Sequence, residues 1–237
     1  MKLYTLKLIS SLFVIAGLFF APPLHAKDTV GKVTEITGKV LVTHEGETKP
    51  CDLADQAPIF LKDTIETKKD GVVKLSLNDA SDFTLRENTK VVVSEFLLDP
   101  KKNKRETVLD VALGKVRAVV TKTFNKAISK TELKTPTAVV GVRGTDFAIE
   151  VGKNKTLVYC LKGLVQTFNP LFPAQTINVA AGMFTDVLQG VVPKLPAAIP
   201  QEMLQEIENQ FGFPVTAEGL KEKGKEELQK HVPFPLP

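Results

Sequence analysis

The sequence predicts an all-β fold, a β-solenoid-like or β-roll-like stack of short strands with a short α-helical C-terminal extension. Two observations indicate this class. Apolar and polar residues alternate over short runs between residues 30 and 188, as they do in half-buried strands. A strand–glycine–strand pattern also recurs at Gly38, Gly114 and Gly163, and a valine follows each glycine two residues later. Because these glycines are unevenly spaced, an irregular β-sandwich is the alternative.

The first 26 residues have the three regions of a secretory signal peptide. Lys2 and Lys7 are basic, residues 8–20 are apolar, and residues 24–26 form an acceptable cleavage site. We therefore expect a periplasmic or otherwise exported protein. A segment that stays uncleaved and anchors the chain in the inner membrane is the alternative, because residues 8–24 approach the length of a short membrane span. We expect contact with a membrane only in that case.

The alternation places the expected strands one after another along the chain. Residues 30–43 read as two strands that meet at Gly38, and the polar residues 99–105 read as the tip of a hairpin. The other expected strands cover residues 73–77, 83–85, 91–96, 109–120, 147–151, 157–161, 164–168, 176–179 and 183–188.

Residues 191–237 have a different composition from the β region. Three prolines make residues 191–200 a linker, and residues 201–211 repeat apolar side chains at helical spacing. A second helix over about residues 217–230 has few apolar side chains to hold it. We expect the first helix to cap an open end of the stack, where edge strands need covering. A helix that binds a partner is the alternative.

Charge and cysteine content limit the function classes. Beyond residue 26, basic groups outnumber acidic groups by only two, which is too few to indicate binding of nucleic acid or of acidic membranes. Cys51 and Cys160 are the two cysteines, and export would favour a disulfide between them. Cys160 also lies in a strand pattern, where a free cysteine packs as a small core residue. The sequence leaves both interpretations open.

The stretch 135–151 has the most specific local pattern. A Thr-Pro step sets an extended approach, because proline disfavours α geometry in the residue before it. Gly141 and Gly144 bracket Arg143, which permits positive φ angles or close backbone contact on either side. Strict alternation of apolar residues then begins at Phe147. We therefore expect Arg143 and Asp146 to share a tight corner between two strands.

This stretch resembles the signature of the FecR domain family, periplasmic domains best known from regulators of iron-siderophore signalling. The similarity extends over most of residues 30–188. It departs at Lys62 and Ala80, where the family most often has glycine. The resemblance implies a FecR-like β domain over residues 27–190, followed by the proline-rich linker and helical cap of residues 191–237.

The signature residues are the candidate site, and we expect them to be mainly structural. The candidates are Thr135, Pro136, Gly141, Arg143, Gly144, Asp146 and Phe147. Arg143 is expected to pair with Asp146 or to cap strand-end carbonyls. The alternative is functional, because the forked donors of arginine suit a carboxylate or phosphate ligand.

No motif in the sequence indicates catalysis. The three histidines have no metal-ligand spacing, and two distant cysteines make no zinc site. Nucleophile elbows, phosphate loops and dinucleotide fingerprints are absent from the sequence. We therefore expect a non-enzymatic protein without metal or cofactor. Its expected role is a binding or scaffold module that recognises an envelope protein or glycan. The alternative is a periplasmic sensor or regulator in envelope or iron-uptake signalling, acting through a separate membrane partner.

Overall fold

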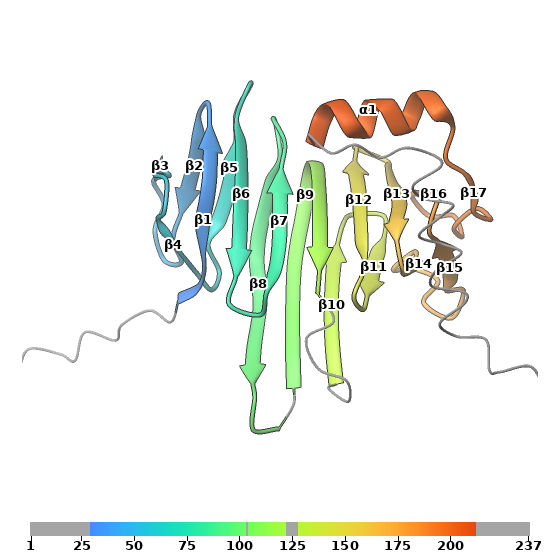
Figure 1. The fold of residues 1–237 in the computed structure, drawn as a ribbon, viewed down its shortest axis with the longest axis horizontal. Helices are drawn as coiled ribbons and strands as arrows, with labels where there is room; N and C mark the ends of the chain where they lie inside the picture. The colour runs from blue at the N-terminus through green and yellow to red at the C-terminus, as the bar shows by residue number, and fades with distance from the viewer. Residues whose placement is uncertain (1–28, 103, 122–127, 212–237) are drawn as a thin grey trace, which may run out of the picture.

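The computed structural model describes residues 29–102, 104–121 and 128–211 (Figure 1). The predicted signal peptide and second helix lie outside these ranges. The elements are β1 (Thr29–Thr37), β2 (Val40–Thr43), β3 (Cys51–Asp52), β4 (Pro58–Phe60), β5 (Thr64–Thr67), β6 (Val72–Leu77), β7 (Ser81–Leu85), β8 (Lys90–Asp99), β9 (Lys104–Val120), β10 (Ile128–Lys134), β11 (Val139–Val142), β12 (Asp146–Val151), β13 (Lys155–Lys162), β14 (Leu164–Phe168), β15 (Ile177–Ala180), β16 (Met183–Leu188), β17 (Ala197–Ala198) and α1 (Gln201–Phe211). The predicted all-β class with one short helix is confirmed.

The strands form two layers. Sheet A has the order β4-β1-β6-β7-β9-β12-β13-β16-β17. Sheet B has the order β3-β2-β5-β8-β9-β10-β11-β14-β15. The long strand β9 belongs to both, because its first part pairs in sheet B and its last part pairs in sheet A. Neighbours run antiparallel except β9 and β10, which are parallel.

Alternating side chains from both sheets form one apolar core. In β6, for example, Val73, Leu75 and Leu77 are buried while the residues between them are partly exposed. This period of two puts every second side chain on the inner face of a strand. The same core cluster takes in residues from β1 to β16, so it runs along the whole stack.

The three glycines of the strand–glycine–strand pattern stand where the chain passes from one sheet to the other. Gly38 links β1 to β2, Gly163 links β13 to β14, and Gly114 interrupts β9 between its two sheets. All three have positive φ, at +66°, +88° and +106° respectively. The pattern therefore marks corners between the layers.

Lys62 and Ala80, the two departures from the FecR pattern, both adopt left-handed backbone conformations. Their φ values are +67° and +60°. Residues other than glycine are destabilised by steric contacts by about 1–2 kcal/mol in this conformation. The two non-glycine residues keep the turns and strain them locally.

Ala80→Gly is expected to stabilise the protein by about 0.5–1 kcal/mol, because the strain removed exceeds the entropy that glycine adds to the unfolded chain. Ala80 is exposed, so little methyl burial is lost. Urea unfolding measures the change. Ala112→Gly, at an exposed strand position, is the matched control and should destabilise instead. Equal losses in both variants would contradict the strain argument.

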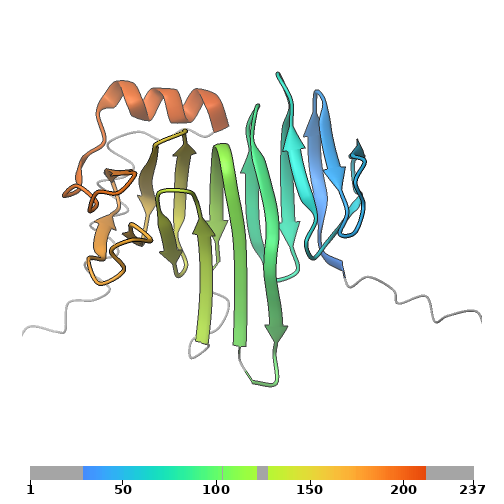
Figure 2. The same ribbon diagram turned by 180° about the vertical axis from the view of Figure 1, so that it is seen from behind.

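The helix α1 runs across one end of β12 and β13, as opposite views show (Figures 1 and 2). Its buried residues Leu204, Ile207 and Phe211 form a second apolar cluster with Ala148 of β12 and Tyr159 of β13. These two side chains point away from the main core, so the helix covers the outer face of sheet A. This placement differs from the expected cap over an edge strand. The apolar outer residues of β12 and β13 explain it, because they would otherwise face water. No helix among the described residues is long and apolar enough to cross a membrane.

The pKa of the Tyr159 hydroxyl depends on how this helix packs on sheet A. Burial, with the carboxylates of Glu150 and Glu206, raises the pKa of Tyr159 well above its usual value. The folded protein therefore favours the neutral phenol of Tyr159. Its contribution to the free energy of unfolding is present below pH 10 and is lost at more alkaline pH, because the tyrosine of the unfolded chain ionises first.

In a Tyr4→Phe variant, which leaves Tyr159 as the sole tyrosine, absorbance titration should show ionisation well above pH 10. Leu204→Asp should lower this pKa by loosening α1, because the Leu204 side chain is buried between the helix and sheet A. Gln205→Asp, on the exposed side, should leave it unchanged. An equal shift in both would contradict the role of helix packing.

Candidate functional site

The Thr-Pro-Thr part of the signature ties the two sheets together. The Thr135 hydroxyl lies 2.8 Å from the Thr156 hydroxyl, and the Thr137 hydroxyl lies 2.7 Å from the same atom. The Ala138 backbone N–H donates to the Thr135 hydroxyl at 2.8 Å, closing the turn between β10 and β11. Thr156 belongs to β13 of sheet A. These buried hydroxyls satisfy one another, and exposed Pro136 occupies the turn.

Asp146 binds Arg117, so the expected pair between Arg143 and Asp146 is wrong. The Arg117 guanidinium donates from Nε at 2.9 Å and from Nη2 at 2.7 Å to the two carboxylate oxygens of Asp146. Pairing of β9 with β12 places Arg117 opposite Ala148, two residues from Asp146 on the same face. The two-pronged geometry and the burial of Arg117, which is 5% exposed, make this a strong structural contact.

Two other signature residues have structural roles. Gly144 has a φ of +66°, a conformation that glycine adopts without steric cost, and it lies in the link between β11 and β12. Phe147 is fully buried in the main core. Together with Asp146 they fix the corner that the sequence predicts.

Arg143 is exposed. Among the described residues, none forms a hydrogen bond or an ion pair with it. It lies just after β11, in the link to β12. The structural role expected for Arg143 therefore has no contact to support it, and its donors face solvent.

Gly141 also has no structural role that the fold explains. It alternates with the buried Val140 and Val142, so its α-carbon faces outward from sheet B. Its φ is not in the left-handed region. A Cβ placed there would have one neighbour within 4 Å, the backbone oxygen of Gln166 at 3.9 Å. A larger residue would fit without a clash, so neither backbone conformation nor packing requires glycine.

Arg143→Ala is accordingly expected to change the free energy of unfolding by less than about 0.5 kcal/mol, as is usual for surface substitutions. Thermal melting of the purified variant measures this. Arg117→Ala is the contrasting variant and should be clearly destabilising, because it removes both hydrogen bonds to Asp146. A substantial loss of stability in Arg143→Ala would restore the structural interpretation.

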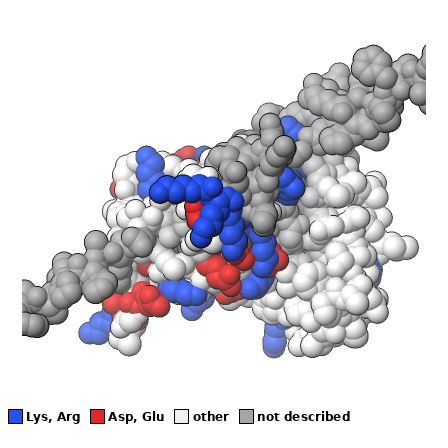
Figure 3. Space-filling model, turned by 90° about the horizontal axis from the view of Figure 1, so that it is seen from below, with Lys and Arg blue, Asp and Glu red and all other residues white. Residues whose placement is uncertain are grey.

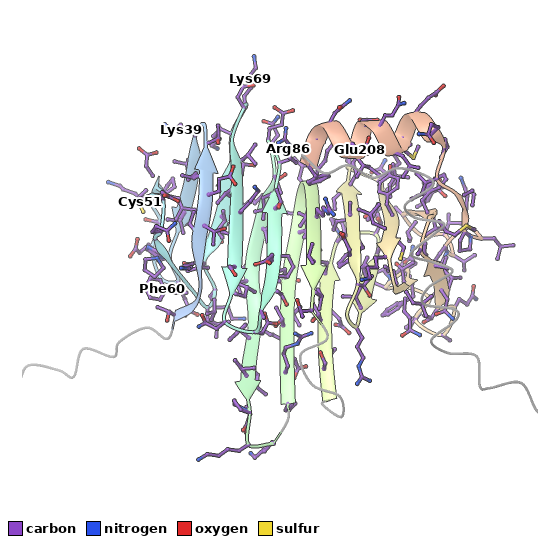
Figure 4. The ribbon with its side chains drawn as sticks, viewed as in Figure 1. Lys39, Cys51, Phe60, Lys69, Arg86 and Glu208 are labelled. Atoms are coloured by element: carbon purple, nitrogen blue, oxygen red, sulfur yellow. The ribbon has the colours of Figure 1, made fainter. Side chains whose placement is uncertain are left out.

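The two cysteines are free thiols in the structure. Cys51 lies in the edge strand β3 at the N-terminal end of the stack (Figure 4). Cys160 is buried in β13, which lies near the other end of the stack (Figure 1). A disulfide needs Cα atoms within about 7 Å of each other. The disulfide that the sequence leaves open is therefore not formed.

Other polar groups in the described residues serve the fold. His44 lies 2.7 Å from the buried carboxylate of Asp63, which also accepts the Phe60 backbone N–H at 2.9 Å. Within the described ranges, no group of histidine, cysteine and acidic residues is placed to hold a metal ion. His25 and His231 lie outside these ranges.

The basic hairpin between β8 and β9 is interleaved with acidic residues. Seen from below, lysines and acidic side chains mix on one part of the surface, while another part is nearly free of charge (Figure 3). Lys104 lies 3.4 Å from Glu106, and Lys130 lies 3.3 Å from Glu132. Although partial burial opposes it, Glu132 and Glu106 raise the pKa of Lys130. These lysines are largely neutralised by neighbours within their own sheet.

Comparison with known families identifies the central part of the chain. Residues 63–166 match the family model described as FecR protein. The resemblance to the FecR domain family is confirmed over these residues. The match begins at Asp63, the buried partner of His44, and it includes the complete signature from Thr135 to Phe147.

The FecR domain also has partial likeness to solved structures. Two crystal structures of a protein assigned as an anti-sigma factor, from Parabacteroides distasonis ATCC 8503, each align with a TM-score of 0.45 and 12% sequence identity. The alignments cover 62% and 63% of this chain and 73% and 74% of the other chains. No curated protein matches the sequence.

Proposed function

We propose that this FecR-domain protein is an exported regulator that senses a state of the cell envelope, such as iron uptake, and passes it on by binding a separate membrane protein. The observation that carries the proposal is the FecR family match over residues 63–166. The sequence resemblance points to regulators in the periplasm. The sequence favours a binding or scaffold module and leaves this regulatory function as the alternative.

The arrangement of polar groups supports binding rather than catalysis. Asp63 is held by His44, Asp146 by Arg117, and Asp79 by Thr107 and Arg105. Each of these carboxylates is buried or half-buried and takes part in contacts within the fold. Pro136 and Arg143 are exposed at the signature, and Gly141 is half-buried on the outer face of its strand. Of these, Arg143 and the bare backbone at Gly141 suit recognition of another molecule.

Deleting the gene in the source bacterium tests the proposal. RNA sequencing under iron-rich and iron-poor conditions should show a small set of transcripts that lose their response, and expression of the full chain should restore it. If the protein acts only as a scaffold, deleting its gene should leave the transcripts unchanged and alter only the retention of its partner in the envelope. Unchanged transcripts in the deletion strain would therefore refute regulation.

A further inference from the structure

We infer that the outer face of sheet B at β11 and β14 binds a protein segment that places a carboxylate on Arg143 and an apolar side chain over Gly141. This surface, the signature face, consists of Val139, Gly141, Arg143, Leu164 and Gln166. The inference rests on the proposed function, because it locates the contact through which such a regulator would act.

The bare backbone at Gly141 is the first argument. Glycine weakens a strand interior, and it commonly marks a place where a ligand or another chain approaches closely. Gly141 is flanked by Glu132 on β10 and by Gln166 on β14, and no described side chain fills the space above it. The missing Cβ thus leaves bare backbone on the surface between Glu132 and Gln166. An apolar or aromatic side chain of a partner would lie over this bare backbone.

Charge is the second argument. The guanidinium of Arg143 faces solvent, whereas the nearby Lys130 is already paired with Glu132 and Glu106. Arginine binds carboxylates through two parallel hydrogen bonds, and such pairs add geometric specificity. The complement of an exposed arginine on this face is therefore an acidic side chain of the partner.

The β14 side of Arg143 is uncharged, whereas the β10 side carries Lys130 and Glu132. Leu164 is 47% exposed and precedes Val165, which pairs with Val142 at the end of β11. Residues 163–185 contain no charged side chain. A partner segment that carries one carboxylate among apolar residues would match this face. An anionic glycan would satisfy Arg143 and leave Leu164 and the bare backbone at Gly141 without an apolar contact, so a protein segment is the better fit.

Photo-crosslinking in the source bacterium tests the inference directly. The full chain carries p-benzoylphenylalanine in place of Gln166, in the native, Gly141→Val and Arg143→Glu backgrounds. We expect a crosslinked protein whose attached peptide contains an acidic residue, and we expect both variants to lose most of this product. The purified variants should melt like the native protein, because Gly141 has room for a side chain and Arg143 contacts none of the described residues through a hydrogen bond or an ion pair.

Two matched controls come from the turn between β12 and β13 in the other sheet. Gly152→Ala has ordinary space for a Cβ, with the nearest atom at 3.6 Å, and Lys153→Glu changes an exposed charge. Both should keep the crosslink. The inference would be overturned if the crosslinked product persisted in the Gly141→Val and Arg143→Glu variants. It would also be overturned if no protein were crosslinked, or if the crosslinked molecule were a glycan.

The same strains separate this inference from the proposed function. If the crosslink depends on Gly141 and Arg143 while deletion of the gene leaves all transcripts unchanged, the surface is right and regulation is wrong. If deletion changes transcripts that both variants still support, regulation is right and the surface is wrong. A partner variant in which a lysine replaces the crosslinked acidic residue should recover binding to Arg143→Glu, since the two side chains then carry opposite charges again.

Discussion

Asp79→Ala is expected to lower the free energy of unfolding by about 3–5 kcal/mol, the usual cost of leaving a buried charge without its partner. Asp79 and Arg105 have side chains that are 0% and 2% exposed, with the carboxylate 3.7 Å from Nε of Arg105. The Asp79 carboxylate also accepts the Thr107 hydroxyl at 2.7 Å and the Ser81 backbone N–H at 3.0 Å. It therefore joins the β6–β7 turn of sheet A to β9 in sheet B.

Urea unfolding at pH 7 measures this loss, and two further variants isolate its cause. Asp79→Asn keeps the shape and an acceptor while removing the charge, so it should fall between the native protein and Asp79→Ala. Asp82→Ala, at an exposed position of the same hairpin, should change stability by less than about 0.5 kcal/mol. If Asp79→Ala behaved like Asp82→Ala, the buried network would contribute little.

This network also explains which strands the sequence could not reveal. The alternation of apolar residues predicts a strand over 73–77, and β6 is Val72–Leu77. The first part of β9 escapes the pattern, because its inward side chains there are Arg105 and Thr107, which read as solvent-exposed. Their burial is made favourable by groups distant in sequence, among them Asp79, Ser129 and the Thr121 carbonyl. A pairing between residues far apart in sequence leaves no local signal.

The strand β10 was equally hidden, for the same physical reason. No strand is expected from residues 128–134, yet they pair in parallel with β9 and antiparallel with β11. The buried residues of β10 include Thr131 beside Leu133, so polarity does not alternate with burial. Here the neighbouring strands decide the conformation, as they often do in sheets.

At the signature, the ion pair expected between Arg143 and Asp146 is not formed, because Asp146 binds Arg117. Arg143 and Asp146 are close in sequence, which favours pairing when the local chain alone is considered. In the fold, Asp146 opens β12, which lies beside β9, and this register brings Arg117 to it instead. The signal for Arg117 is an arginine at an outward position of an apolar strand, but its partner follows only from the strand order.

Gly114→Ala is the other substitution with a large expected effect, a loss of more than about 3 kcal/mol, because strain and overlap add. The φ of Gly114 is +106°, far from the conformations that alanine prefers. An added Cβ would also lie 2.4 Å from the Cα of Thr89, a backbone atom that cannot rotate away.

The surroundings of Gly114 give it little room to relax. The Lys115 backbone N–H donates to the Thr89 hydroxyl at 3.0 Å, so Thr89 is held against the point where β9 leaves sheet B for sheet A. Gly141→Ala is the matched control within a strand, where the new Cβ meets only an atom at 3.9 Å, and it should be neutral or slightly stabilising in urea unfolding. Equal stability of the two variants would mean that β9 can change sheets without a left-handed residue. The strand–glycine–strand pattern would then lose its physical explanation, because Gly114 is its most constrained member.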